Sequence, residues 1–411
     1  MKTILLTSTL AFSLIGPGSS YELHEWGTFT SVSGSDGKLL AGLTKEEEKL
    51  PNFVHTHAGM ENVGPQNLFS KGFSATRPLR NVKIKMETPV IYFYSDEPFK
   101  ASVEVGFNGG SISQWFPQRS SGETVPKITK RHIEMTQTGH RLSEAHFKEG
   151  GGIDFAKPFQ GNIKWDLEVL PPDVPRSLSF KPHETLNWVR PRNHKANILK
   201  VGNQYEDYLF YRGVGNFELP VTFRVDENET LHIENTGDED IPFFFVQEDI
   251  PGKGVRFHTS TDGLKTGSSI SLTESDLGQI IGKWQHPVYD AMTEGLLKTG
   301  LTREETDSMI QTWWHSYFHK PGLRVFWIVP EKKTEEILPL KVSPAPEKMV
   351  RVIVGRSEVL RPRFEKQLLA GYEKRNDKKE AHLWINQLNN RYGIAYQKRV
   401  QELLDKKVAA K

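Results

Sequence analysis

The chain has 411 residues, a net charge of +2 at pH 7 and no cysteine. Its length predicts more than one ordinary hydrophobic core, and its near-neutral charge excludes a global basic surface for nucleic acid. The lack of cysteine excludes disulfide bonds, thiolate catalysis, cysteine-ligated zinc and iron–sulfur clusters.

The first 20 residues have the three-part pattern of a secretory signal peptide. Lys2 supplies a positive charge, residues 4–16 form a short apolar run, and the small residues 18–20 follow a proline. This pattern predicts cleavage near Tyr21 and export to the periplasm or the extracellular space. No later stretch reaches the ~18–20 apolar residues that span a bilayer, so we expect no transmembrane segment in the mature chain.

Residues 21–215 are expected to form a β-rich N-terminal domain. Apolar and polar side chains alternate as on half-buried strands, and one continuous apolar run is typical of a strand buried on both faces. The alternating segments are 82–86, 103–107 and 163–169, the continuous run is 90–94, and a further strand is expected at 23–32. Asn108-Gly109 predicts a hairpin between 103–107 and 111–116, because Asn-Gly accepts the positive φ of a tight turn.

Beyond residue 215 the pattern changes from strands to helices. Turn signals every ~8–12 residues between short alternating strands predict a compact β-sandwich-like unit at 216–273. Residues 274–411 are expected to be mainly helical, and Thr302 and Glu305 predict a capping box at the start of one helix. Two strands are expected in this region, at 323–329 and 350–354. The predicted fold class is α+β, a large antiparallel β portion with a sandwich-like unit followed by a helical C-terminal region.

Histidine and glutamate residues gather in the first hundred residues. His24 and Glu25 lie on a predicted strand, and His55 and His57 have the H-x-H spacing that puts two imidazoles on one face of a strand. We therefore consider His24, His55 and His57 as ligands of one divalent metal such as zinc. Glu25 or Glu87 would then act as a general base on a metal-bound water. The competing interpretation places His55 and His57 on an irregular surface loop.

Two further polar motifs allow both a functional and a structural interpretation. Arg212 directly follows an apolar run, where a guanidinium can pair with a carboxylate of the protein, such as Glu87, or of a ligand. We favour the internal ion pair. His315 and His319 share one helix face, but Ser316 stands where metalloproteases have glutamate. We interpret these histidines as a polar face near a helix C-terminus, where the helix dipole favours histidine.

Four segments give the chain a family resemblance. They are HEWGTFTSV at 24–32, KMETPV at 85–90, FYRG at 210–213 and GLRV at 322–325. On these segments the chain resembles a family of exported bacterial proteins of unknown function. The resemblance implies one family over most of the mature chain, not a fusion of unrelated modules, and it implies no activity, cofactor or site residue.

Two functional classes follow from these patterns. The first is an exported binding or surface-associated protein for a glycan or a protein ligand, supported by the signal pattern, the β-rich architecture and the aromatic content. The alternative is a metal-assisted exported hydrolase with Glu25, Glu87 and Arg212 as catalytic residues. Tryptophans on alternating strands can stack on sugar rings but more often fill a core. We favour binding, because every candidate residue of the hydrolase also has a structural interpretation.

Overall fold

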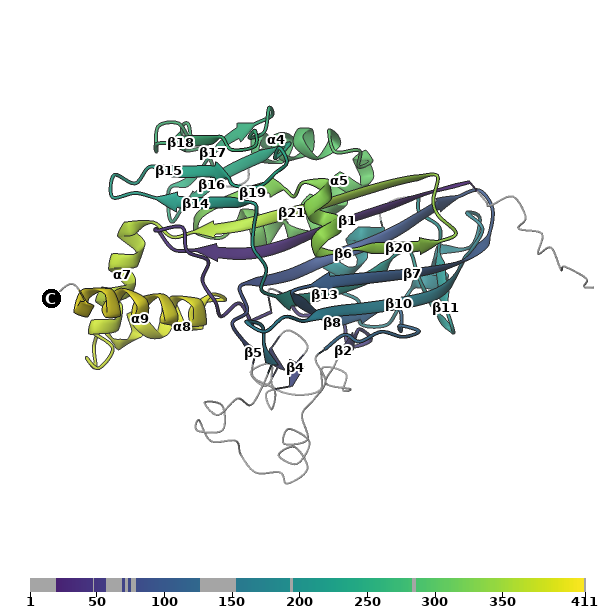
Figure 1. Cartoon of the computed structure of the whole chain (residues 1–411), viewed down its shortest axis with the longest axis horizontal. Helices are drawn as coiled ribbons and strands as arrows, with labels where there is room; N and C mark the ends of the chain where they lie inside the picture. Colours follow the sequence, from purple (N-terminus) through teal and green to yellow (C-terminus); the bar gives the residue numbers. More distant parts are fainter. Residues whose placement is uncertain are drawn as a thin grey trace, which may run out of the picture.

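A computed structural model describes residues 20–46, 48–56, 69–70, 73–74, 79–125, 153–192, 195–282 and 286–409. Most of the predicted signal peptide therefore lies outside the described residues. The described part has an α+β fold with a large mixed sheet at its centre (Figure 1).

The central strands of this sheet come from both halves of the chain. In sheet order they are β8 (Gly110–Phe116), β13 (Leu209–Gly215), β6 (Ile84–Ser95), β1 (Tyr21–Ser33), β21 (Lys348–Val359), β19 (Gly322–Ile328), β16 (Phe244–Ile250) and β17 (Gly254–Ser260). Neighbours on this path are antiparallel except β1 and β21, which are parallel. Since β1 lies between β6 and β21, the sheet crosses the domain boundaries predicted at 215 and 273.

A second β layer packs on one face of these central strands. It contains β7 (Phe99–Asn108), β10 (Gln160–Val169), β20 (Leu340–Ser343), β11 (Leu199–Val201) and β12 (Gln204–Glu206), together with a separate sheet of β14 (Val221–Val225), β15 (Leu231–Asn235) and β18 (Ser269–Leu272). Trp165, Phe223 and Trp327 belong to one buried apolar cluster between the layers. Short strands complete the β structure: β2 (His55–Thr56), β3 (Phe69–Ser70), β4 (Phe73–Ser74), β5 (Leu79–Arg80) and β9 (Ile153–Asp154).

The segment 216–273 does not form a single unit. Strands β14, β15 and β18 form the small sheet, whereas β16 and β17 join the large one. The sequence gives a physical reason, because Phe244, Phe245 and Val246 bury side chains on both faces of β16. A strand that is apolar on both faces needs a layer on each side, and within the large sheet β16 is covered by the small sheet on one face and by helices on the other.

The hairpin predicted at Asn108-Gly109 is wrong. Gly109 does have a positive φ of +76°, but β7 pairs with β10 and β20 while β8 pairs with β13. The ring of Phe107 lies over Gly110, where an added Cβ would be 2.5 Å from the ring. The turn therefore carries the chain from one β layer into the next instead of joining two paired strands.

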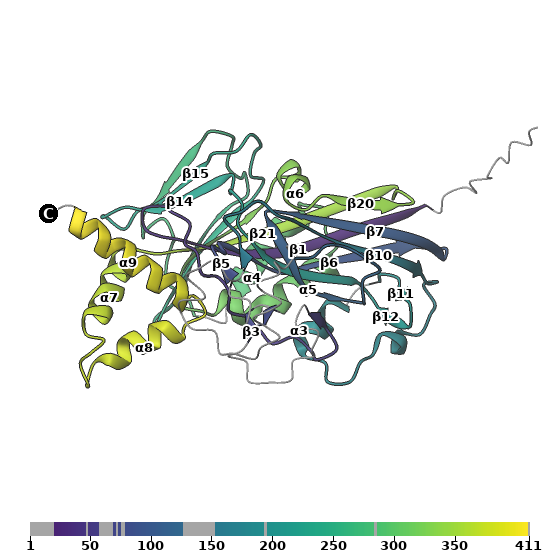
Figure 2. The same cartoon turned by 60° about the horizontal axis from the view of Figure 1, so that its bottom comes forward.

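Helices surround the sheet: one, at residues 331–337, packs against β7 and β21 beside the second β layer, and the others cover the opposite face and one end of the sheet. They are η2 (Arg176–Ser179), α3 (Leu186–Val189), η3 (Arg190–Arg192), α4 (His286–Leu297), α5 (Arg303–Trp313), the π-helical turn η4 (Trp314–Phe318), α6 (Glu331–Ile337), α7 (Pro362–Glu373), α8 (Ala381–Asn389) and α9 (Gly393–Ala409). The predicted capping box of Thr302 and Glu305 begins α5. Figure 2 shows α7, α8 and α9 grouped at one end of the molecule. In the part of the chain described here, no helix is long and apolar enough to cross a bilayer.

Candidate functional site

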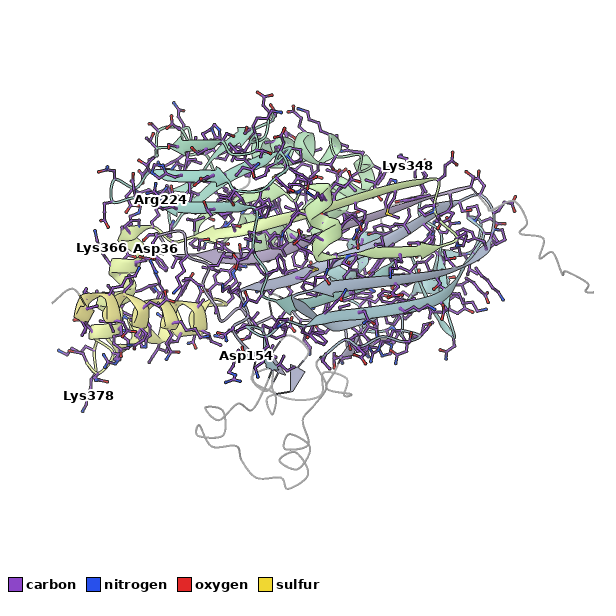
Figure 3. The ribbon with its side chains drawn as sticks, viewed as in Figure 1. Asp36, Asp154, Arg224, Lys348, Lys366 and Lys378 are labelled. Atoms are coloured by element: carbon purple, nitrogen blue, oxygen red, sulfur yellow. The ribbon has the colours of Figure 1, made fainter. Side chains whose placement is uncertain are left out.

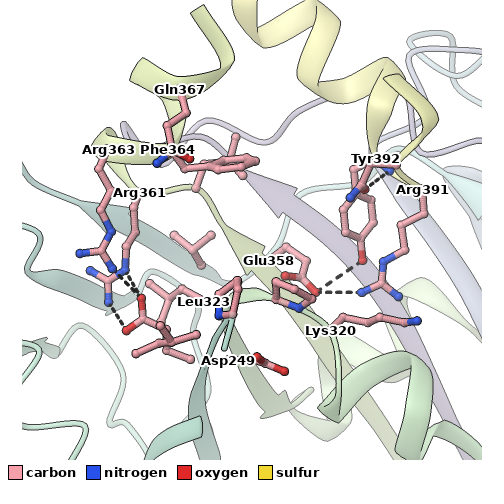
Figure 4. A pocket seen from close by; sticks show the side chains of 18 of the residues that line it. Asp249, Lys320, Leu323, Glu358, Arg361, Arg363, Phe364, Gln367, Arg391 and Tyr392 are labelled. Atoms are coloured by element: carbon pink, nitrogen blue, oxygen red, sulfur yellow. Dashed lines mark hydrogen bonds and ion pairs between the residues drawn. The ribbon is translucent and has the colours of Figure 1, made fainter. Parts of the chain in front are cut away.

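A cavity of about 1050 Å³ opens between the ends of β16, β19 and β21, the turn η4 and the C-terminal helices (Figure 4). We call it the sheet–helix pocket. Charged, amide and aromatic side chains line it together. These polar and aromatic residues are Glu48, Glu248, Asp249, Lys253, Arg256, Glu274, His315, Ser316, Lys320, Glu358, Arg361, Arg363, Phe364, Gln367, Gln387, Asn390, Arg391, Tyr392 and Tyr396.

On one wall of the pocket, three guanidinium groups surround the carboxylate of Glu358. Arg324 Nε lies 3.1 Å from Glu358 Oε1, Arg356 contacts the same oxygen, and Arg391 Nη2 lies 3.5 Å from it. Burial opposes ionisation of Glu358, but the three arginines outweigh it and hold the pKa of this carboxyl below its ordinary value. Glu358 is therefore anionic at neutral pH, and its wall carries more positive than negative charge.

The opposite wall is built on Glu248, which also receives three arginines. Arg361 donates from Nε to Glu248 Oε1 at 2.7 Å, Arg363 donates to the same oxygen at 2.8 Å, and Arg256 donates from Nε to Oε2 at 2.9 Å. Glu274 lies near all three arginines, at 2.6 Å from Arg363, 3.0 Å from Arg256 and 4.0 Å from Arg361. This wall is close to charge balance, unlike the Glu358 wall.

The π-helical turn η4 places one residue, Ser316, on the positive wall. Ser316 lines the pocket, and its buried hydroxyl has no hydrogen-bond partner among the described residues. Arg391 donates to the Ser316 carbonyl at 2.7 Å, which holds the guanidinium against the backbone of this turn. Lys320 lies four residues further on and lines the same wall with an exposed side chain. We call Ser316, Lys320 and Arg391 the donor cluster. Single π turns are frequent at functional sites, because they place side chains that a regular helix would not.

The pocket as a whole holds a surplus of positive charge. Six lysine and arginine side chains line it, and Arg324 and Arg356 lie directly behind Glu358. Five carboxylates line it, and Glu229 pairs with Arg361 from outside. Among the described residues, eight cationic groups therefore face six carboxylates. Two of the cationic groups, Lys253 and Lys320, are exposed, so the surplus positive charge lies where an anionic group that enters the pocket would be attracted to it.

A second cavity of about 30 Å³ lies deeper, between β6, β13 and the end of α5. Glu48 lines both cavities, so they are neighbours. Thr88 Oγ1 and Trp313 Nε1 line the small cavity and are buried with no hydrogen-bond partner among the described residues. A cavity of this size matches the volume of about one water molecule, and polar groups of this kind are normally satisfied by one.

The predicted residues Glu87 and Arg212 meet at this small cavity. Arg212 Nη1 lies 3.7 Å from a Glu87 carboxylate oxygen, and both side chains are buried. Lys85 Nζ lies 3.3 Å from the other oxygen of Glu87, and Arg212 also donates to Glu46 and Gln114. The internal ion pair predicted for Arg212 is confirmed by this contact.

The other predicted residues of β1 lie elsewhere, on opposite faces of the sheet. His24 Nδ1 lies 3.0 Å from both carboxylate oxygens of Glu305, on the face covered by α5. Glu25 accepts hydrogen bonds from Arg351 Nε and from the Tyr211 hydroxyl, both at 2.7 Å, on the face covered by the second β layer. Burial and the neighbouring Glu25 raise the pKa of Tyr211 well above its ordinary value. Neither residue lines the sheet–helix pocket.

The predicted metal site has only part of its ligands within the described residues. His55 lies on β2, where its ring stacks on Phe116 and its Nε2 lies 3.3 Å from Gln204 Oε1. His57 lies outside the described residues. Within the described part of the chain, no group of three or more histidine, aspartate or glutamate side chains is placed to hold a metal ion. Zinc bound by His24, His55 and His57 stays a prediction.

The residues that line the positive wall are not among those predicted as site residues. Arg324, Arg356 and Glu358 lie within strongly apolar strand segments of the sequence. A charged side chain inside such a segment must find a partner, because an isolated buried charge is very costly. Charged residues within an apolar strand segment are therefore the sequence signal from which this wall could have been predicted.

Comparison with known proteins adds no relative. No protein-family model matches the chain, and no curated protein matches it with significant similarity. The resemblance to an exported bacterial family stays a prediction carried by its four segments.

Proposed function

We propose that this is an exported binding protein that holds a small anionic ligand in the sheet–helix pocket. The observation that carries the proposal is the donor cluster beside the surplus positive charge of the Glu358 wall. Ser316 lines the pocket and has a buried hydroxyl with no described partner, Arg391 donates to the Ser316 carbonyl, and Lys320 adds an exposed ammonium group. The predicted signal peptide supports an extracytoplasmic location.

The shape of the site supports binding of a small molecule more than docking of a protein. Cavities of about 300–1,000 Å³ with a few convergent polar groups are typical of small-ligand sites. The sheet–helix pocket, at about 1050 Å³, lies at the upper end of this range. The metal-assisted hydrolase stays a second prediction, since its ligand set includes His57.

The test is isothermal titration of the mature protein with small anions, after a thermal-shift screen of carboxylates, sulfate, phosphate and uronic acids. We expect Lys320→Gln and Arg391→Gln each to weaken binding of the best anion by about tenfold or more, because each removes a charge-assisted donor. Binding should also weaken as salt concentration rises.

The matched control is Lys348→Gln, which removes the same charge at the other end of β21. Lys348 is exposed and pairs with Glu22 at 2.8 Å, far along the strand from Glu358 (Figure 3). It should leave affinity unchanged. If Lys320→Gln and Lys348→Gln weakened anion affinity equally, the loss would come from the overall charge of the protein and not from a local contact. That result would contradict the assignment of the donor cluster.

A further inference from the structure

We propose that the ligand is a saccharide that carries an acidic group, an inference that rests on the proposed function and names its ligand class. A simple inorganic anion would occupy the donor cluster and leave most of the cavity of about 1050 Å³ unused. The other residues that line the pocket therefore indicate the chemistry of the rest of the ligand.

Carboxylates on the pocket lining disfavour a ligand that is negative throughout. Asp249 is buried and lines the pocket beside Gly322, its cross-strand neighbour on β19. Glu48 lines it as well. Like charges brought into a partly desolvated site repel strongly, so a polyphosphate or polysulfate would meet repulsion away from the donor cluster. A ligand with one acidic group at the donor cluster and neutral hydrogen-bonding groups elsewhere avoids this repulsion.

The C-terminal helices supply side chains that suit hydroxyl groups. Gln367 on α7, Gln387 on α8 and Asn390 after α8 line the pocket with primary amides. Each amide both donates and accepts hydrogen bonds, and each ionised carboxylate accepts. A hydroxyl also does both, so a lining that mixes carboxylates, guanidinium groups and amides matches a ligand with several hydroxyls.

Aromatic rings contribute an apolar surface between these polar groups. Phe364 projects from α7 toward the pocket, and Tyr392 lies across from it near Glu358 (Figure 4). Tyr392 is held in place, since its hydroxyl lies 3.5 Å from Glu358 Oε1 and the Arg391 guanidinium lies 4.8 Å from its ring centre. A sugar ring presents hydroxyls at its edge and C–H groups on its face, which aromatic rings can cover. The combination of a donor cluster, amides, carboxylates and aromatic rings thus fits an acidic saccharide.

The experiment compares digalacturonate with its dimethyl ester, which keeps the hydroxyls and loses the charge. Inorganic phosphate and sulfate serve as anions without hydroxyl-bearing rings, and a sulfated disaccharide tests another acidic group. We expect digalacturonate or the sulfated disaccharide to bind at least tenfold more tightly than both the ester and the inorganic anions. Which of the two binds more tightly identifies the acidic group.

Two variants separate the two parts of the site. Lys320→Gln should reduce the preference for the acid over the ester, whereas Gln367→Ala together with Gln387→Ala should weaken both sugars and leave binding of phosphate unchanged. Both glutamines are surface-accessible helix positions, so the double variant should fold.

The outcomes distinguish the inference from the proposed function. If inorganic anions bind as tightly as the acidic sugars and Lys320→Gln still weakens their binding, the saccharide inference is wrong and the anion site remains supported. If the acid and the ester bind equally tightly and Lys320→Gln changes neither affinity, the donor cluster does not bind the acidic group, and the proposed function is wrong. Absence of binding by every probe would overturn both.

Discussion

At the scale of single residues, buried carboxylates in this molecule fall into two groups by what surrounds them. Glu25 is fully buried, receives Arg351 and Tyr211, and faces an apolar cluster. Glu358 and Glu248 are also held by arginines, but they line a large cavity. The first arrangement indicates a structural ion pair, and the second places charge where a ligand can reach it.

Glu25→Gln should lower the free energy of unfolding by about 3 kcal/mol, because it removes the fully buried one of the two carboxylates that pair with the Arg351 guanidinium. Urea denaturation of the mature protein measures the change. Glu168→Gln is the control, since Glu168 pairs with Lys200 on the surface and exposed pairs contribute little. A stable Glu25→Gln protein that loses a hydrolytic activity would instead support the catalytic role predicted from the sequence.

The small cavity beside Glu87 leads to a second prediction at this scale. If one water satisfies Thr88 Oγ1 and Trp313 Nε1, Thr88→Val removes one of its partners and should cost about 1 kcal/mol of stability. Urea denaturation again gives the value, with the exposed Thr222→Val as control. Stabilisation by Thr88→Val would show that the cavity is dry and that its polar lining is an uncompensated cost.

At the scale of elements, α5 is attached to the sheet through the same carboxylate that caps it. Glu305 accepts from the Thr302 backbone at 2.8 Å, from the Tyr94 hydroxyl at 2.7 Å and lies 3.0 Å from His24 Nδ1. Burial opposes ionisation of Glu305, but the hydrogen bonds and the charge of His24 outweigh it, so its pKa is below the ordinary value of 4.5. One side chain thus fixes both the start of the helix and its position on β1.

This depressed pKa predicts how acid acts on the protein. A carboxyl whose pKa is lower in the folded state stabilises the fold above its unfolded pKa, and this contribution is lost as pH falls through the folded value. We therefore expect Glu305→Gln to flatten the decline of Tm below about pH 4.5, in addition to lowering Tm at neutral pH. Thermal denaturation from pH 3 to 7 measures both. Glu304→Gln, on the exposed face of the same turn, should keep the wild-type slope, and parallel curves for the two variants would refute the assignment.

Local patterns were sufficient to predict many elements but few of their partners. The later part of the alternation at 82–86 and the apolar run at 90–94 belong to one strand, β6, and two residues are enough to predict the capping box at Thr302. The Asn108-Gly109 turn was also located, yet its strands belong to different layers. Turn chemistry depends on neighbouring residues, whereas strand pairing depends on long-range packing that no short segment contains.

At the scale of the whole molecule, the sequence does not reveal that the sheet is completed by its two ends. Strand β1 pairs in parallel with β21, more than three hundred residues later. This pairing brings Glu358 and the helices that follow it to the end of β16 and β19, and so creates the sheet–helix pocket. A residue that needs a buried partner could be predicted where a local anomaly marks it, as the charge of Arg212 beside an apolar run does. The pocket depends on elements distant in the chain, so its residues could not be grouped from spacing.

The Glu248 wall connects these distant elements and gives the last prediction. Arg256 on β17, Arg361 before α7 and Arg363 on α7 all donate to Glu248, and Arg361 also donates to the Glu229 carbonyl between β14 and β15 at 2.8 Å. Glu248→Gln should leave three guanidinium groups short of one charge and loosen this junction. We expect amide hydrogen exchange at least ~10-fold faster at the start of α7 and in the β14–β15 turn.

Helix α9 should respond differently, because apolar packing holds it as well. Tyr396 and Val400 belong to a buried cluster with Val32 and Leu43 near the end of the sheet. The amides of α9 should therefore stay protected from exchange in the Glu248→Gln variant. The control is Glu227→Gln, which removes an exposed partner of Lys366 and should leave exchange in both α7 and α9 unchanged. Uniformly faster exchange over α7 and α9 would mean that the C-terminal helices detach as one unit. In that case the Glu248 arginines, and not the apolar cluster, would be what holds the pocket closed on its helical side.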